Sequence, residues 1–201
     1  MPSCPGTMTN PLAGQPISPP RLSAAFRQRC EALATEARYA LGLKAFQPLP
    51  ARQLAAHYQV LLLTPLDLAA DAGAAVAQVL SQPGWSAALI SRQPPVILHH
   101  PLHSAARQEA NLMHELAHLL LGHPLPAFDP ATWPATLDKQ HEREADYLGS
   151  CLQIPRRGLE WAQQRGFTRQ QTAAHFGASL QLVSWRCNAT GITILSAALD
   201  A

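Results

Sequence analysis

The sequence predicts an α+β protein that is mostly helical, with a small antiparallel sheet placed directly before its central helix. Two observations lead to this fold class. Apolar side chains recur every three or four residues over several segments, which is typical of helices that bury one face. Two short apolar runs, at 85–90 and 96–99, are separated by the loop 91–95, which favours a β-hairpin.

Composition limits the class of protein. The chain has 201 residues and a formal net charge of +2, which is too small to indicate a nucleic-acid partner by itself. No apolar run approaches the ~20 residues that span a bilayer. No basic residue precedes Arg21, so the start is not a secretion signal. The four cysteines form no CxxC pair and indicate a reducing cytoplasm: Cys4, Cys30, Cys151 and Cys187.

Three regions follow from the pattern along the chain. Residues 1–20 hold six prolines and predict a disordered tail. Residues 21–154 form the main domain, and residues 155–201 form a helical segment that packs on it. Within these regions we expect helices at 21–43, 51–58, 66–80, 104–121, from 139, 156–165, 168–176 and 179–189, and strands at 60–63, 85–90 and 96–99.

The central helix carries His114, Glu115 and His118, which form an HExxH pattern. Residues four apart lie on one helical face, so the two imidazoles can hold one tetrahedral metal ion, usually zinc. Glu115 follows the first histidine and can reach a water held by that metal. The alternative is a pair of core histidines that happen to be four residues apart.

Both ends of this helix have recognisable signals. Ser104 is a reasonable N-cap and Gly122 stands where a terminal glycine would end the helix. His123 is then expected to be exposed just past the helix end. His99 and His100 are expected to end an edge strand and face solvent. The buried stripe between these ends consists of Leu112, Met113, Leu116, Leu119 and Leu120.

A catalytic zinc site usually takes a third protein ligand. The pattern that supplies a histidine shortly after HExxH fails, because Leu121 and Pro124 occupy its glycine and histidine positions. Glu142, on a second predicted helix, is the best remaining candidate. Asp146 lies one turn later and can accept the other ring N–H of a ligand histidine. Glu144 points about 200° away and is expected in solvent; the alternative is that this whole stretch is a charged surface face.

Two motifs together resemble the ImmA/IrrE metallopeptidases. Residues 114–123 read HELAHLLLGH and residues 142–148 read EREADYL, followed by an apolar stretch that ends at Pro155. The family has HELxHxxLGH, ExEA(N/D)xFA and a similar stretch; residues 147–150 depart from it. The resemblance covers residues 50–190. It implies a zincin-like domain with bound Zn²⁺ and proteolysis of intracellular repressors, which are protein substrates.

The expected mechanism is that of a zinc peptidase. A zinc-activated water attacks the peptide carbonyl and Glu115 acts as general base. His114, His118 and Glu142 are the expected metal ligands. Asp146 is expected to hydrogen-bond a ligand histidine as an outer partner, without binding the metal itself. Tyr147, His123 and His141 are all candidates for stabilising the oxyanion. An intact Glu115 argues against a purely structural zinc site, which needs no general base.

A DNA-binding regulator with a non-catalytic zinc site is the alternative function. Residues 168–186 resemble a helix-turn-helix, and residues 155–187 hold five arginines against one glutamate. Thr172 and His175, however, stand where a two-helix DNA-binding unit needs apolar residues. We therefore expect this segment to pack on the peptidase domain, and Arg186 is the residue whose replacement would test DNA binding. The sequence predicts no oligomeric state.

Overall fold

The computed structural model describes residues 22–67, 85–125 and 138–196. The predicted tail at 1–20 and most of the predicted helix at 66–80 lie outside these residues. None of the described helices is long and apolar enough to cross a membrane. The described elements are α1 (Ala24–Ala40), α2 (Ala51–His57), β1 (Leu61–Leu63), β2 (Ala87–Arg92), β3 (Pro95–His99), α4 (Ala105–Leu121), α5 (Lys139–Gln153), α6 (Arg156–Gln164), α7 (Arg169–Phe176) and α8 (Leu180–Thr190).

The sheet is mixed rather than purely antiparallel, which corrects the prediction in part. Strands β2 and β3 form the expected hairpin, and β1 pairs with β3 in parallel, giving the order β1-β3-β2. A parallel neighbour has to be reached through a crossover. The hairpin signal reports local pairing and carries no information on such a crossover. The mostly helical α+β class is confirmed.

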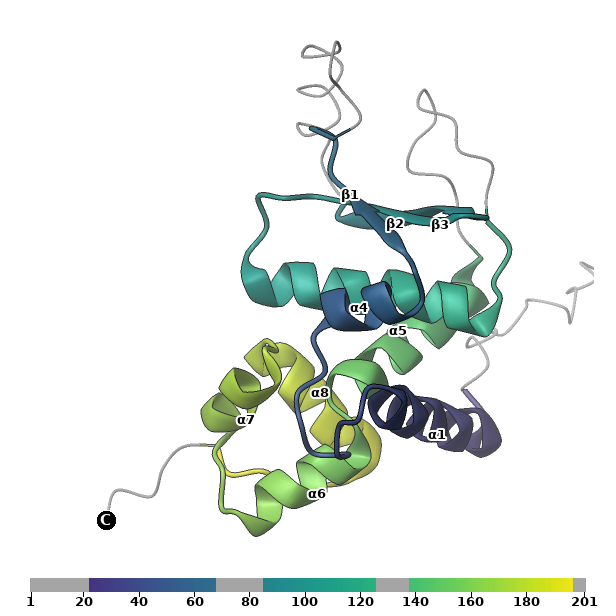
Figure 1. The fold of residues 1–201 in the computed structure, drawn as a ribbon. Coiled ribbons are helices and arrows are strands. Elements are labelled where there is room, and N and C mark those ends of the chain that lie inside the picture. Colours follow the sequence, from purple (N-terminus) through teal and green to yellow (C-terminus); the bar gives the residue numbers. More distant parts are fainter. Residues whose placement is uncertain (1–21, 68–84, 126–137, 197–201) are drawn as a thin grey trace, which may run out of the picture.

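Helix α4 lies along one face of the sheet and packs on α5 (Figure 1). The contact between the two helices is close because α5 has a glycine there. A Cβ on Gly149 would stand 3.1 Å from the backbone N and Cα of His114. The backbone of α5 is thereby held directly against the turn of α4 that carries the first histidine of HExxH.

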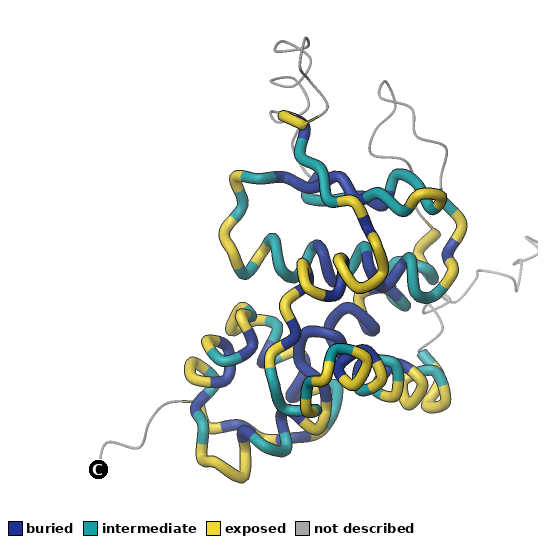
Figure 2. Tube along the Cα trace, in the orientation of Figure 1, coloured by how far each residue is buried: buried dark blue, intermediate teal, exposed yellow. Residues whose placement is uncertain are grey.

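Buried apolar side chains form two clusters. Figure 2 shows where the buried residues lie along the chain trace. The larger draws its buried members from residues 30–152, and is built by α1, α2, the sheet, α4 and α5. The smaller draws them from residues 154–194, and is built by α6–α8 and the segment after them. The predicted domain boundary at 154–155 remains a prediction.

Arg186 of α8 joins the two clusters and is fully buried. Its guanidinium donates to the Glu31 carboxylate of α1 and, at 2.8 Å, to the carbonyl of Ile154. A side chain held in this way cannot reach a DNA base. His175 of α7 contacts the N-terminal part of the chain, since its Nε2 lies 2.9 Å from the Phe46 carbonyl, whereas the buried Thr172 hydroxyl donates to the Thr168 carbonyl of its own segment at 2.8 Å. These contacts disfavour the DNA-binding alternative.

Candidate metal centre

Helix α4 places both histidines of HExxH on one face. Ser104 occupies the N-cap position and Gly122 the C-cap, with a left-handed φ of 75° that a glycine adopts without strain. Arg92 of β2 secures the last turn by donating to the carbonyls of His118, at 2.9 Å, and Leu119, at 3.3 Å. The orientation of the second histidine is therefore fixed by the sheet as well as by the helix.

Three potential metal ligands converge: His114, His118 and Glu142. The Nε2 atoms of the two histidines are 3.0 Å apart. The Glu142 oxygens lie 3.4 Å from Nε2 of His114 and 3.1 Å from Nε2 of His118. One ligand atom from each residue fits within 4.8 Å of the others. The structure thus brings together the predicted ligands from two helices.

The site favours positive charge. Burial alone would lower the pKa of His114, but hydrogen bonds to Asp146 and Glu142 outweigh it and raise that pKa to about 10. Burial alone would raise the pKa of Glu142, but hydrogen bonds from His114 and His118 lower it to about 2. Both pKa shifts have the same origin, because hydrogen bonds between imidazoles and carboxylates favour the charged form of each partner. A cation placed between these carboxylates is stabilised in the same way.

Glu115 points toward the sheet beside this group. Its Oε2 accepts a hydrogen bond of 2.7 Å from the backbone N–H of Leu89 on β2. The pairing of β2 with β3 shifts register between Leu89 and Ser91, next to this contact. Burial raises the pKa of the Glu115 carboxyl. A carboxylate with a raised pKa accepts a proton more readily than an exposed one, as a general base requires.

Asp146 lies where the sequence predicts. Its Oδ1 is 2.9 Å from Nδ1 of His114, although two thirds of its side chain is exposed. The contact uses the ring nitrogen opposite the one that faces Glu142. Such a carboxylate fixes the tautomer of a ligand histidine and raises its basicity.

His123 and Glu144 are not where the sequence predicts. His123 is 5% exposed, and its Nδ1 lies 3.0 Å from Nδ1 of His118. Glu144 is part-buried, and its Oε2 lies 3.1 Å from Nε2 of His123. Burial lowers the pKa of His123, which favours the neutral form of its ring. The turn at Gly122 brings His123 back against α5, which helical periodicity alone does not reveal.

The structure also places Tyr147 and the other histidines of this region. His99 and His100 are 4% and 9% exposed, so the prediction that they face solvent is wrong. His100 stacks on His103 with ring centroids 4.3 Å apart, which keeps its ring in the interior. Tyr147 packs against Phe26 and Trp185, on the side of α5 that faces α1 and α8. His141 stacks on His123 at 4.4 Å and stays a candidate for the oxyanion.

Comparison with known protein families decides the class. A peptidase family model, described as the IrrE N-terminal-like domain, matches residues 72–188. The chain belongs to this family. The match covers α4 and α5 and continues through α6 and α7 into α8. No curated protein matches the chain.

Family membership gives the converging residues a chemical context. The chain is a member of a metallopeptidase family, whose substrates are proteins, and it carries a His-His-Glu group that could hold a metal ion.

Proposed function

We propose that the protein is a zinc-dependent endopeptidase that cleaves an intracellular protein, with Glu115 as general base. The convergence of His114, His118 and Glu142 beside Glu115 carries this proposal. Two imidazoles and one carboxylate are a known ligand set of catalytic zinc, and they leave a fourth position free.

The residues present fit a divalent cation on chemical grounds. Glu142 Oε1 is buried and lies 3.1 Å from Nε2 of His118, so a carboxylate oxygen with little access to water faces the same point as the two imidazoles, which supports a ligand role. Without a metal, the two Nε2 atoms at 3.0 Å can share a single proton at best. Nitrogen donors with a single carboxylate favour zinc over magnesium or calcium, which prefer oxygen ligands.

Each residue then has a task. When bound, zinc would supply a Lewis acid that polarises the scissile carbonyl and makes water more acidic. Glu115 takes the proton of the attacking water and returns it to the leaving amine. The Leu89 N–H holds one oxygen of the Glu115 carboxylate, which leaves the other oxygen for the proton. Asp146 holds the His114 ring with its Nε2 toward the site.

The substrate we propose is a cytoplasmic transcriptional repressor. This part of the proposal rests on the motifs at 114–123 and 142–148, which resemble those of repressor-cleaving ImmA/IrrE enzymes. Cleavage of a repressor would make the protein a regulator of transcription that needs no DNA contact of its own.

Glu115→Gln tests the mechanism, because glutamine keeps the shape and the hydrogen bond from Leu89 but is a very weak base. The protein is co-expressed with repressors encoded beside it, and fragments are identified by mass spectrometry. We expect discrete fragments with the wild type and at least about 10²-fold fewer with Glu115→Gln, at unchanged zinc content and folding. Equal cleavage by both proteins would reject Glu115 as the base.

A further inference from the structure

His123 occupies a buried position between the end of α4 and helix α5. After the left-handed turn at Gly122, its N–H donates to the carbonyl of His118 at 3.2 Å. Its own carbonyl accepts from Arg92, the residue that also holds the His118 carbonyl. Backbone contacts on both sides therefore fix where the His123 ring stands relative to His118.

The ring contacts form a continuous line from His118 to Glu144. His118 Nδ1 and His123 Nδ1 are 3.0 Å apart, and His123 Nε2 lies 3.1 Å from Glu144 Oε2. Gln140 donates to the other Glu144 oxygen at 2.7 Å. An amide donor on one oxygen leaves the second oxygen of this carboxylate directed at His123.

These partners determine where the protons lie. A carboxylate accepts hydrogen bonds, so His123 donates Nε2–H to Glu144. The two Nδ1 atoms of His118 and His123 form a hydrogen bond only if one donates and the other accepts. A His118 ring that holds a metal through Nε2 carries its proton on Nδ1. His118 must then donate its Nδ1–H to His123. That tautomer leaves the lone pair of His118 on Nε2, the atom that faces His114 and Glu142.

We propose that His123 and Glu144 are positioning residues that hold His118 in its metal-binding tautomer, a task that Asp146 performs for His114. The proposal rests on the proposed function, because it assigns His118 a ligand role. The line from His118 through His123 to Glu144 is called the His118 relay below. Such outer partners contribute about 10–100-fold to metal affinity in zinc proteins.

The two ligand histidines are supported differently. His114 has a direct carboxylate, which is largely exposed, so water can take over part of its role. His118 has a buried imidazole as its direct partner, and the carboxylate lies one residue further out. Loss of His123 should therefore be felt more strongly than loss of Asp146.

Zinc affinity of the full-length chain, measured by competition with a chromophoric chelator, tests the His118 relay. We expect His123→Ala to weaken zinc binding by about 10–100-fold. His123→Asn should recover most of this loss, because the asparagine Oδ1 stands near the place of Nδ1 and can accept from His118. His123→Gln reaches toward Glu144 instead and should recover less. Thermal melts in chelator confirm that each variant folds.

A double-mutant cycle distinguishes an effect transmitted through His118 from a general loss of structure around the metal site. Glu144→Ala should weaken zinc binding, and the double variant with His123→Ala should be no weaker than His123→Ala alone, since both act through His118. Adding Asp146→Ala to His123→Ala should multiply the two losses, because these residues serve different histidines. Nitrogen NMR of the zinc-loaded protein should show His118 protonated at Nδ1 and His123 at Nε2.

Two outcomes overturn the relay while the proposed function stands. One is a zinc affinity of His123→Ala within about threefold of wild type, well short of the loss of about 10–100-fold expected for an outer partner. The other is the reverse pair of tautomers. Multiplied losses for His123→Ala with Glu144→Ala would overturn it as well. Absence of zinc binding by the wild type would instead reject the proposed function, and the relay with it.

Discussion

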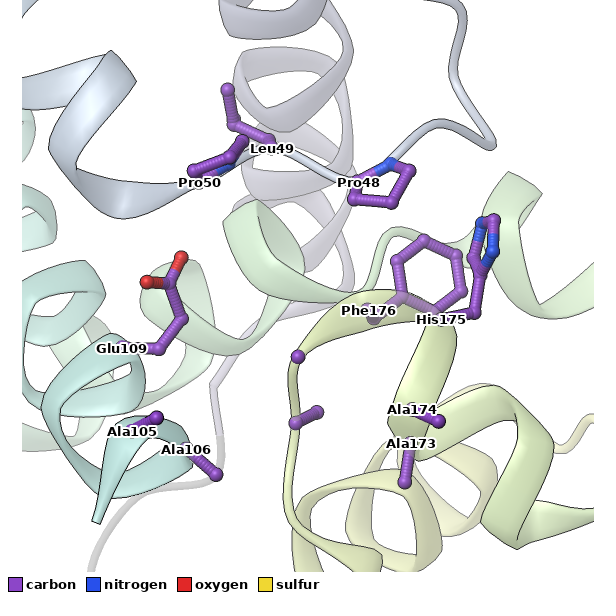
Figure 3. Close-up of a pocket in the computed structure, with 12 residues that line it drawn as sticks. Pro48, Leu49, Pro50, Ala105, Ala106, Glu109, Ala173, Ala174, His175 and Phe176 are labelled. Atoms are coloured by element: carbon purple, nitrogen blue, oxygen red, sulfur yellow. The ribbon is translucent and has the colours of Figure 1, made fainter.

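Glu109 shows how the environment of one side chain sets its charge. It lines a groove of about 510 Å³ between α4, α7 and residues 48–50 (Figure 3). Its Oε1 accepts from the N–H of Ala51 at the start of α2. Burial raises the pKa of the Glu109 carboxyl despite this hydrogen bond. Because the groove is otherwise mostly apolar, an ionised carboxylate there is less well solvated than in the unfolded chain.

We expect Glu109→Gln to stabilise the protein near neutral pH. A folded pKa above the unfolded one means that the protonated form is favoured by folding, so its stabilisation is complete below the unfolded pKa and is lost as pH rises through the folded pKa. Glutamine keeps the acceptor for Ala51 and carries no charge. The gain in melting temperature over wild type should therefore be larger at about pH 8 than at about pH 4.

The exposed Glu36 of α1 provides the matched control. Glu36→Gln should change the melting temperature little, because substitutions at exposed positions change stability by less than about 0.5 kcal/mol. A Glu109→Gln gain that is the same at both pH values, or larger in acid, would contradict the burial argument.

At the scale of elements, the contact between α4 and α5 brings the candidate metal ligands together. Gly149 permits this contact, because a methyl group there would meet the backbone of His114 at 3.1 Å. Backbone atoms within a helix cannot turn aside as a flexible side chain can. The position of Glu142 and Asp146 relative to His114 therefore depends on a residue that offers no side chain.

Gly149→Ala should lower both stability and zinc affinity. Crowding in a packed interior costs about 1–3 kcal/mol, and alanine regains about 1 kcal/mol of helix propensity. We expect a net loss of about 1 kcal/mol in unfolding free energy by denaturant titration. Ser150→Ala is the control for a change at the neighbouring position of α5. It removes a hydroxyl that donates to the Tyr147 carbonyl of its own helix, so the hydrogen bond that is lost lies within α5. A Gly149→Ala variant more stable than wild type would refute the close-contact account.

Periodicity accounts for what the sequence predicts of this region and for what it misses. Residues His114, His118, Glu142 and Asp146 lie on two regular helices, where spacing decides which side chains share a face, and the structure brings all four together. His123 follows the left-handed turn at Gly122, so spacing assigns it no direction. The expectation that Glu144 lies in solvent fails for the same reason. Glu144 contacts His123, and the sequence does not predict where His123 lies.

For the whole molecule, Arg186 and Glu31 tie the C-terminal helices to α1. The pair is buried on the Arg186 side, and the Glu31 carboxylate also accepts from the N–H of Arg156 at 2.8 Å. Contacts between residues 31 and 186 join distant parts of the chain, so no local pattern predicts them. In the sequence, Arg186 is only one of the five arginines of residues 155–187, and a count of charges says nothing about burial.

Arg186→Ala should destabilise the molecule by about 3–5 kcal/mol, since removing one partner of a buried ion pair leaves the other uncompensated. Denaturant titration measures this loss. Arg157→Ala, at an exposed position of α6, serves as the control and should change stability by less than about 0.5 kcal/mol. A loss below about 1 kcal/mol for Arg186→Ala would mean that the pair is solvated, as surface pairs are.

The zinc content of the purified protein tests the metal site most directly. Protein loaded with zinc and then desalted is analysed for metal, with His118→Ala and His103→Ala as the informative pair, because His103 stacks on His100 outside the converging group. A three-ligand site predicts about one zinc per chain in the wild type and in His103→Ala, and its loss in His118→Ala. Unchanged zinc content in His118→Ala would contradict the account.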